Sequence, residues 1–152
     1  MKKLSEEIRH FLQNQGFVII STIDKNGYPH NSCKGIVKIN GNDKIYLLDL
    51  YHAKTCTNLK ANPHISITVV DEHKFKGYCL KGRAKIIVGN NLALEIIRAW
   101  ESRITTRIAQ RLLKNMREEK GHSQHPEALL PKPEYMIEME VDEIVDLAYP
   151  LV

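Results

Sequence analysis

The sequence has few cysteines and none of the common motifs of nucleotide-binding or hydrolytic enzymes. Cys33, Cys56 and Cys79 are its only three cysteines, and no two of them form a CxxC pair. This odd count indicates neither a disulfide framework nor a zinc ribbon, so we expect free thiols. A Walker loop, a GxGxxG motif after a strand, a GxSxG elbow and an HExxH helix are all missing. Their absence removes the usual signatures of phosphate, dinucleotide, serine hydrolase and zinc protease sites.

Long hydrophobic runs are missing as well. No apolar run approaches the length of a membrane span, and the N-terminal segment MKKLSEEIRHF reaches acidic residues before the apolar core of a signal peptide could form. We therefore expect a cytoplasmic protein. With 152 residues, 43% hydrophobic and 26% charged, the chain is long enough for one ordinary core, so we expect a single domain over 1–152. Its net charge of +4 favours anionic ligands without selecting nucleic acid over a phosphorylated cofactor.

The stretch from Ile45 to Val70 predicts a strand, a short helix and a second strand. Residues 45–48 are uninterruptedly apolar, and residues 65–70 alternate between apolar and polar side chains. Between them, the helix spans 53–61 and stops before Pro63, because proline cannot continue it.

The first turn of this helix carries a cation beside two hydroxyl groups, from Lys54, Thr55 and Thr57. Because the N–H groups and the dipole at a helix N-terminus favour an anion, the turn is a candidate phosphate seat. The alternative is that Lys54 is a solvated surface charge and that a threonine only caps the helix. The pattern alone favours this alternative.

The rest of the chain predicts further strands joined by tight turns. After a helix capped by Ser5, strands are expected at 17–23, 29–39, 77–88 and 135–141, with 144–147 extending the last one. Gly27 suits the positive φ of the first hairpin turn, and Gly82 inside a strand indicates a bulge or a sharp bend. Successive strands of this kind predict a mainly β protein with helices, an antiparallel meander that closes into a small barrel.

The first half of the strand at 29–39 is unusually polar for a central strand. It contains His30, Asn31, Ser32, Cys33 and Lys34, whereas its second half is ordinary and apolar. A polar half strand requires either solvent or a ligand, and the pattern is equally compatible with both.

The segment 91–120 lacks proline and predicts a helical insertion. A bend at Ser102 or at the Thr105-Thr106 pair would make it one broken helix or two short ones. The positions expected to be buried are Leu94, Ile97, Ile104, Ile108 and Leu112. The opposite face carries a basic stripe made of Arg103, Arg107, Arg111, Lys114 and Arg117. Such a stripe is typical of a solvated face, because a nucleic-acid footprint would add interleaved aromatics and a groove-entering motif.

Two weaker patterns give no assignment. His122 and His125 lie in a proline-containing loop without cysteine or acidic partners, so we expect no metal site there. Cys56 with His52 one turn earlier imitates a catalytic thiolate pair. A cysteine at helical spacing from Leu59 is, however, typical of a buried small hydrophobic residue. The sequence specifies no catalytic acid or base.

Taken together, the stretches NGYPHNSCKG, YLLDLYHAKTCTNLKANPHISITVV and GYCLKGRAKI resemble the pyridoxamine 5'-phosphate oxidase-like family of FMN-binding split barrels. The most specific part is AKTCTNLKANP, with a basic residue and a hydroxyl, then Asn-Leu, then Asn-Pro before the next strand. The resemblance implies an antiparallel, Greek-key-like split β-barrel with flanking helices. It also implies a cytoplasmic homodimer that holds FMN between its subunits and passes electrons or hydride to a small-molecule substrate.

The resemblance implies roles for eight residues. Lys54 and Thr55 would hold the FMN phosphate, and Asn58 would support the turn. The flavin would pass one strand at Ser32, Cys33 and Lys34, and the main chain of Leu48 and Asp49 would border it. The polar half strand and the helix start thereby become two walls of one site. Lys76 and Gly77 would face the flavin from the second subunit, and Trp100 is expected to pack in the core.

The sequence also departs from true pyridoxamine phosphate oxidases. Their arginine-rich C-terminal stretch, which binds the substrate phosphate, has no counterpart in the ending AYPLV. We therefore do not expect oxidation of vitamin B6. Two alternatives stay open: the same fold using deazaflavin F420 or haem, and a non-enzymatic flavin-binding or electron-transfer protein.

Overall fold

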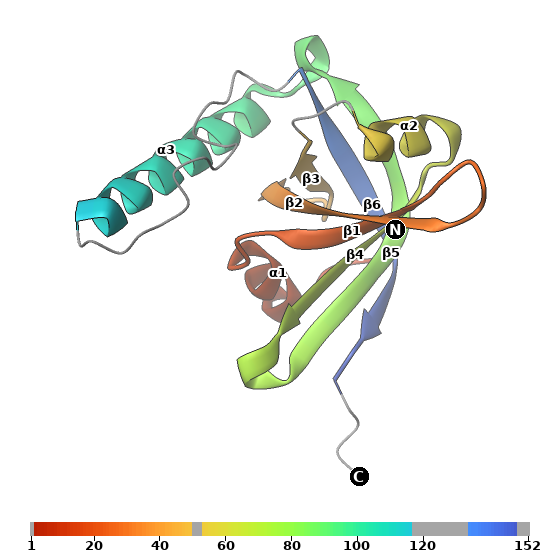
Figure 1. Cartoon of the computed structure of the whole chain (residues 1–152), viewed down its shortest axis with the longest axis horizontal. Coiled ribbons are helices and arrows are strands. Elements are labelled where there is room, and N and C mark those ends of the chain that lie inside the picture. Colours follow the sequence, from red (N-terminus) through yellow and green to blue (C-terminus); the bar gives the residue numbers. More distant parts are fainter. Residues whose placement is uncertain (1, 50–52, 117–133, 149–152) are drawn as a thin grey trace.

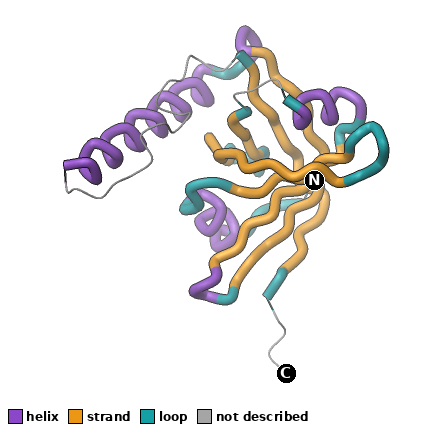
Figure 2. Tube along the Cα trace, viewed as in Figure 1, coloured by secondary structure: helices purple, strands orange, loops and turns teal. Residues whose placement is uncertain are grey.

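The computed structural model describes residues 2–49, 53–116 and 134–148. The strands are β1 (Val18–Ile23), β2 (Pro29–Ile39), β3 (Ile45–Leu48), β4 (His64–Asp71), β5 (Lys76–Val88) and β6 (Tyr135–Asp146). The α-helices are α1 (Glu6–Gln13), α2 (Lys54–Ala61) and α3 (Leu94–Met116), and the short 3-10 turns are η1 (Glu72–Lys74) and η2 (Gly89–Asn91). The mainly β composition with flanking helices confirms the predicted fold class (Figures 1 and 2).

The strands form a closed antiparallel barrel in the order β1-β2-β3-β6-β5-β4. Two three-stranded meanders, β1-β2-β3 and β4-β5-β6, therefore meet along two seams, where β1 pairs with β4 and β3 pairs with β6. The chain crosses from one meander to the other through α2 instead of pairing β3 with β4. The predicted closure into a barrel is confirmed, but a single meander is wrong as the strand order.

Local sequence signals account for the ends and bends of these elements. Ser5 caps α1, because its Oγ accepts a hydrogen bond from the Ile8 N–H at 3.3 Å. The β1–β2 turn has Gly27 at φ 84°, and the Asp24 carboxylate accepts from two backbone N–H groups of that turn. At Gly82 the register between β5 and β6 shifts, which confirms the predicted bulge.

The core has two parts. The barrel interior is filled by inward-facing side chains such as Ile20, Leu47, Ile67 and Leu80, all fully buried. A second cluster lies outside the barrel, where Ile96 and Trp100 of α3 pack on the outer face of β2, β3 and β6. The predicted core role of Trp100 is confirmed.

Helix α3 differs from its prediction. It is continuous over Leu94–Met116 and extends away from the barrel in Figure 1, so the expected break is wrong. Thr105 and Thr106 hydrogen-bond back to the carbonyls of Glu101 and Ser102, at 2.9 Å each, without interrupting the helix. Leu94 is 60% exposed, contrary to its expected burial.

Three further predictions concern the last strand, three histidines and membrane-spanning helices. The predicted strand at 135–141 and its expected extension over 144–147 form one strand, β6, which ends at Asp146. His52, His122 and His125 lie outside the described residues. Within those residues, no helix is both long and apolar enough to cross a membrane.

Candidate functional site

The first turn of α2 lies against the polar half of β2. The hydroxyls of Ser32 and Thr55 hydrogen-bond each other at 3.0 Å. Thr55 is 1% exposed and therefore faces the barrel, whereas the neighbouring Lys54 is exposed. The sequence predicted these two segments as two walls of one site, and the structure does bring them together.

The N-terminus of α2 has no side-chain cap. Ala53 occupies the N-cap position, and no hydroxyl accepts from the first N–H groups. Thr57 instead donates to the Ala53 carbonyl at 3.5 Å. The part of the alternative interpretation in which a threonine caps this helix is therefore wrong, whereas the exposure of Lys54 agrees with its other part, a solvated surface charge. An uncapped first turn keeps the favourable electrostatics that a helix start offers to an anion.

Lys54 lies near the β1–β2 turn at the same end of the barrel. Backbone hydrogen bonds from Tyr28 and Asn26 lower the pKa of Asp24, and the charge of Lys54 acts in the same direction. The exposed ammonium group of Lys54 is thus a cation beside the uncapped turn.

Beneath α2 lies a buried group of three polar side chains, Lys34, Asp49 and Tyr135. The Asp49 carboxylate, with a fully buried side chain, accepts from the Lys34 ammonium and from the Tyr135 hydroxyl, the latter at 2.5 Å. Burial, the hydrogen bond to Asp49 and the neighbouring Cys56 of α2 raise the pKa of Tyr135 well above its ordinary value. The phenol consequently stays protonated and acts as a donor.

The other predicted residues have different surroundings. The Asn58 amide donates to the Thr22 hydroxyl of β1 at 3.0 Å, with both side chains buried, so Asn58 ties α2 to the barrel. Cys33 points to the exposed face of β2. Leu48 is buried with Trp100 in the cluster under α3.

The donor set suits a phosphate group. The uncapped first turn offers backbone N–H groups, Lys54 offers an exposed cation, and Ser32 and Thr55 offer hydroxyls next to it. These are the groups that proteins commonly use for phosphate at a helix start.

The chain matches a known protein family over most of its length. The model of the family described as pyridoxamine 5'-phosphate oxidase matches residues 4–140. The chain belongs to the pyridoxamine 5'-phosphate oxidase family. Proteins of this family are in general associated with flavins. A search of curated proteins found no match.

Solved structures show the same family fold. HupZ from Group A Streptococcus has a TM-score of 0.67 at 18% identity, covering 95% of this chain and 94% of that one. A protein of Clostridium acetobutylicum, described as related to general stress protein 26 and of the pyridoxinephosphate oxidase family, has a TM-score of 0.61 at 20% identity, with coverages of 92% and 84%. A protein described as an F420 reductase has a TM-score of 0.58 at 14% identity, with coverages of 93% and 98%. At these identities the likeness concerns the fold.

In this member of the pyridoxamine 5'-phosphate oxidase family, Lys76 and Gly77 border a hollow of about 700 Å³ beside η1. The Lys76 ammonium pairs with Glu7 of α1 and lies 5.8 Å from the centre of the Tyr78 ring. The hollow has an apolar rim, because Val70, Phe75 and Leu147 are 59%, 90% and 45% exposed.

The basic stripe of α3 is not wholly solvated. Arg103 donates to the carbonyls of Gln15 and Gly16 at 3.3 Å each, and Arg107 also donates to Gly16. Both guanidinium groups lie near Gly35 of β2. For these two arginines the solvated-face interpretation is wrong, since they fasten α3 to the end of α1, where a cation also complements the helix dipole. The side chains of Arg111, Lys114 and Arg117 lie outside the described part of the molecule.

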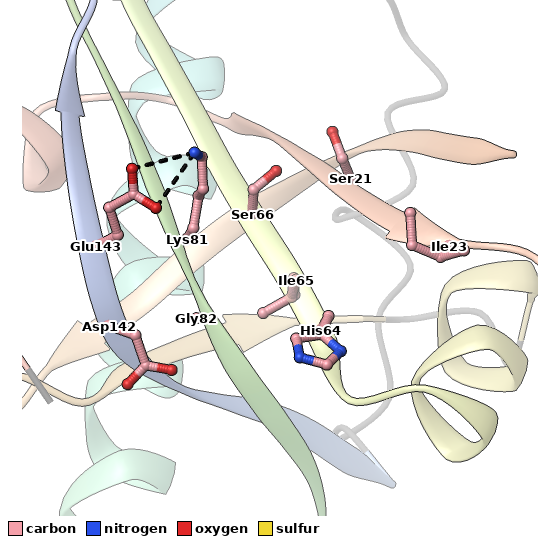
Figure 3. Close-up of a pocket in the computed structure, with 9 residues that line it drawn as sticks. All are labelled: Ser21, Ile23, His64, Ile65, Ser66, Lys81, Gly82, Asp142 and Glu143. Carbon is pink, nitrogen blue, oxygen red and sulfur yellow. Dashed lines mark hydrogen bonds and ion pairs between the residues drawn. The ribbon is translucent and has the colours of Figure 1, made fainter. Parts of the chain in front are cut away.

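A second hollow, of about 330 Å³, was not predicted from the sequence. Figure 3 shows it on the outer face of the barrel beside the Gly82 bulge, with Lys81 and Glu143 paired at 3.2 Å across it. In the sequence, Gly82 is the feature that could have indicated this hollow, because a bulge locally distorts the sheet. Its lining residues are Ser21, Ile23, His64, Ile65, Ser66, Lys81, Gly82, Asp142 and Glu143. None of the eight residues predicted to contact flavin lines it.

Proposed function

We propose that this protein binds FMN noncovalently and acts as an FMN-dependent oxidoreductase on a small molecule. The observation that carries the proposal is the contact between the polar half of β2 and the uncapped start of α2, through Ser32 and Thr55, beside the exposed Lys54. Family membership supports a flavin in general, and the donor set supports the phosphate of FMN in particular.

In this proposal the phosphate is held by Lys54, Thr55 and the first N–H groups of α2. The ribityl chain and ring pass β2 at Ser32, Cys33 and Lys34, and the main chain of Leu48 and Asp49 borders them. Asn58 keeps α2 in place through Thr22. When bound, FMN would supply the electron or hydride transfer, and the protein would hold and orient it.

We further propose that the protein is a homodimer with the flavin at the subunit interface. Ile19 and Val70 lie exposed on the outer faces of the neighbouring strands β1 and β4, and the exposed Phe17, Phe75 and Leu147 extend this apolar area. The same outer face carries the opposite charges Lys81–Glu143 and Arg83–Asp142. A face that is apolar and carries both signs of charge can pack against its own copy about a two-fold axis.

The first experiment is an absorbance spectrum of the purified protein, before and after addition of FMN and removal of the excess. We expect a bound flavin spectrum. Lys54→Ala and Thr55→Ala should each weaken FMN binding about tenfold or more, because each removes a contact to a charged phosphate. Lys60→Ala is the matched control, since Lys60 is an exposed lysine in the last turn of the same helix. Unchanged affinity in both first-turn variants would contradict the seat.

A deazaflavin is the second candidate, because one structure with this fold is described as an F420 reductase. The absorbance spectrum of the cofactor extracted from the protein distinguishes FMN, deazaflavin and haem. Flavin that binds tightly but is neither reduced nor reoxidised by any tested substrate would favour a non-enzymatic carrier.

A further inference from the structure

The buried group under α2 gives an inference that rests on the proposed function and extends it. Lys34 comes from β2, Asp49 follows β3 directly, and Tyr135 begins β6. Three separate strands therefore converge on one carboxylate. Tyr135 also lies in the same buried cluster as Cys56 of α2, and Cys56 contributes to raising the pKa of Tyr135, so this group adjoins the helix that carries the phosphate seat.

A buried carboxylate with two donors fixes the positions of all its partners. Asp49 is 1% exposed and Tyr135 is 3% exposed, so neither group can exchange its partner for water. Loss of one partner would leave a buried charge with incomplete compensation, which is strongly unfavourable. The arrangement is consequently rigid.

We propose that Asp49 and Tyr135, joined by Lys34, are positioning residues, which hold the start of α2 against β2 and thereby set the affinity for FMN without the side chains of Asp49 and Tyr135 contacting it. The Ser32–Thr55 bond and the Asn58–Thr22 bond fasten other points of α2 to the barrel. The triad holds the chain where it leaves β3 toward α2, because Asp49 directly follows Leu48, the last residue of β3.

The molecule contains a matched control for this proposal. On the outer face of the barrel, the buried Glu138 accepts from Lys44 at 2.9 Å and from Tyr46 at 2.8 Å. This second triad has similar chemistry, with a tyrosine and a lysine on one buried carboxylate, which also pairs with Lys85 of β5 at 3.1 Å. It joins β3, β5 and β6, and none of these partners of Glu138 belongs to α2.

The test compares Tyr135→Phe with Tyr46→Phe. Each variant removes one hydroxyl and creates no steric conflict. We expect Tyr135→Phe to weaken FMN binding about five- to tenfold and to speed hydrogen exchange of the α2 amides from Thr57 to Asn62 in the cofactor-free protein. Tyr46→Phe should change neither. Thermal unfolding of both variants shows whether they lose comparable stability, so that a general loss of stability is separated from loss of positioning.

Asp49→Asn provides a second variant, because it keeps the shape of the side chain and removes its charge. Its effect on FMN affinity should exceed that of Tyr135→Phe. Lys34→Met combined with Asp49→Asn should recover part of the affinity, since the double variant leaves no unpaired charge.

Equal changes in affinity or in α2 exchange for the two tyrosine variants would overturn the proposal. So would faster α2 exchange in Tyr135→Phe with unchanged FMN affinity. If the wild-type protein fails to retain FMN, the proposed function is wrong, and so is the proposed effect of the triad on FMN affinity. The exchange comparison then decides separately whether the triad holds α2 in place.

Discussion

Two buried carboxylates in this molecule are each held by a tyrosine and by one or two lysines, but they lie in different parts of the barrel. Asp49 lies inside it under α2, and Glu138 lies on its outer face. Neither pairing can be predicted from sequence spacing, because the tyrosine and carboxylate are 86 and 92 positions apart in the chain. The expectation that Asp49 borders a flavin rests on the family resemblance, which gave no information about its buried partner Tyr135.

Glu138 makes stability depend on pH. Burial alone would raise the pKa of Glu138, but hydrogen bonds from Lys44, Tyr46 and Lys85 outweigh it and lower the pKa below the ordinary value of 4.5. The stabilisation is therefore complete above about pH 4.5 and is lost as the pH falls through the lower folded pKa. Glu138→Gln should reduce the free energy of unfolding by about 1–3 kcal/mol at pH 7, and by progressively less below pH 4.5.

Urea unfolding of the wild type and Glu138→Gln across this pH range measures the difference. Glu140→Gln is the control, because Glu140 is 41% exposed at its side chain and pairs with Lys44 at the surface. Its effect should be smaller. A Glu138→Gln effect that stays constant down to pH 3 would contradict the assignment.

Gly82 is required for close approach of the backbone. A Cβ atom at this position would lie 1.9 Å from the Glu140 carbonyl oxygen, so any side chain forces β5 and β6 apart. Gly82→Ala should cost about 3 kcal/mol or more in the free energy of unfolding. Gly41→Ala, which places its Cβ in open space, should stay within about 1 kcal/mol of the wild type. Similar stabilities of the two variants in urea unfolding would show that the bulge tolerates a side chain.

At the scale of the elements, sequence patterns predicted the position of each described strand, because turn residues and alternation are local signals. The predicted strands 29–39 and 45–48 coincide with β2 and β3. The break predicted in helix α3 is wrong, because the threonine hydroxyls donate to carbonyls one turn back and the helix continues. Leu94 was assigned to the buried face by spacing alone, but the second core cluster forms around Ile96 and Trp100.

Ile96 should therefore anchor α3. It is 1% exposed, and Ile96→Ala should reduce the free energy of unfolding by about 2–5 kcal/mol. Leu94→Ala, at a position that is 60% exposed, should change it by about 0.5 kcal/mol or less. Trp100 is the sole tryptophan and is buried in the same cluster, so its fluorescence reports on the docking of α3 during unfolding. Equal destabilisation by the two variants would place the anchor elsewhere.

At the scale of the whole molecule, the strand order could not be predicted from the residues. Tight turns predict the pairings β1–β2, β2–β3 and β4–β5, and these are correct, whereas β5 and β6 pair across the long segment 89–134. The seams β1–β4 and β3–β6 join strands that no turn connects, so local signals carry no information about them. The strand pattern predicted that the sheet closes into a barrel, and the family resemblance added the split-barrel, Greek-key-like arrangement.

The proposed dimer gives a prediction at this scale. Val70→Lys places a charge on the exposed apolar face without disturbing the core, since Val70 is 59% exposed. We expect the wild type to elute as a dimer in size-exclusion chromatography with light scattering, and Val70→Lys to elute as a monomer with weakened FMN binding. Leu113→Lys on α3, at 55% exposure, is the control and should remain a dimer. A dimeric Val70→Lys would move the interface to another face.

The seam between β3 and β6 also has a consequence for folding kinetics. The strands β1, β2 and β3 and the pair β4–β5 are neighbours in the chain, whereas β6 pairs with β5 and with β3 across long stretches of sequence, and Tyr46 and Glu138 at this seam are 92 positions apart. Contacts of such separation form slowly, because the intervening chain must lose entropy before they add stability. We therefore expect β1-β2-β3 and the β4–β5 hairpin to form early, and β6 to pair and close the barrel late. Substitutions at the β3–β6 seam should then accelerate unfolding far more than they slow folding.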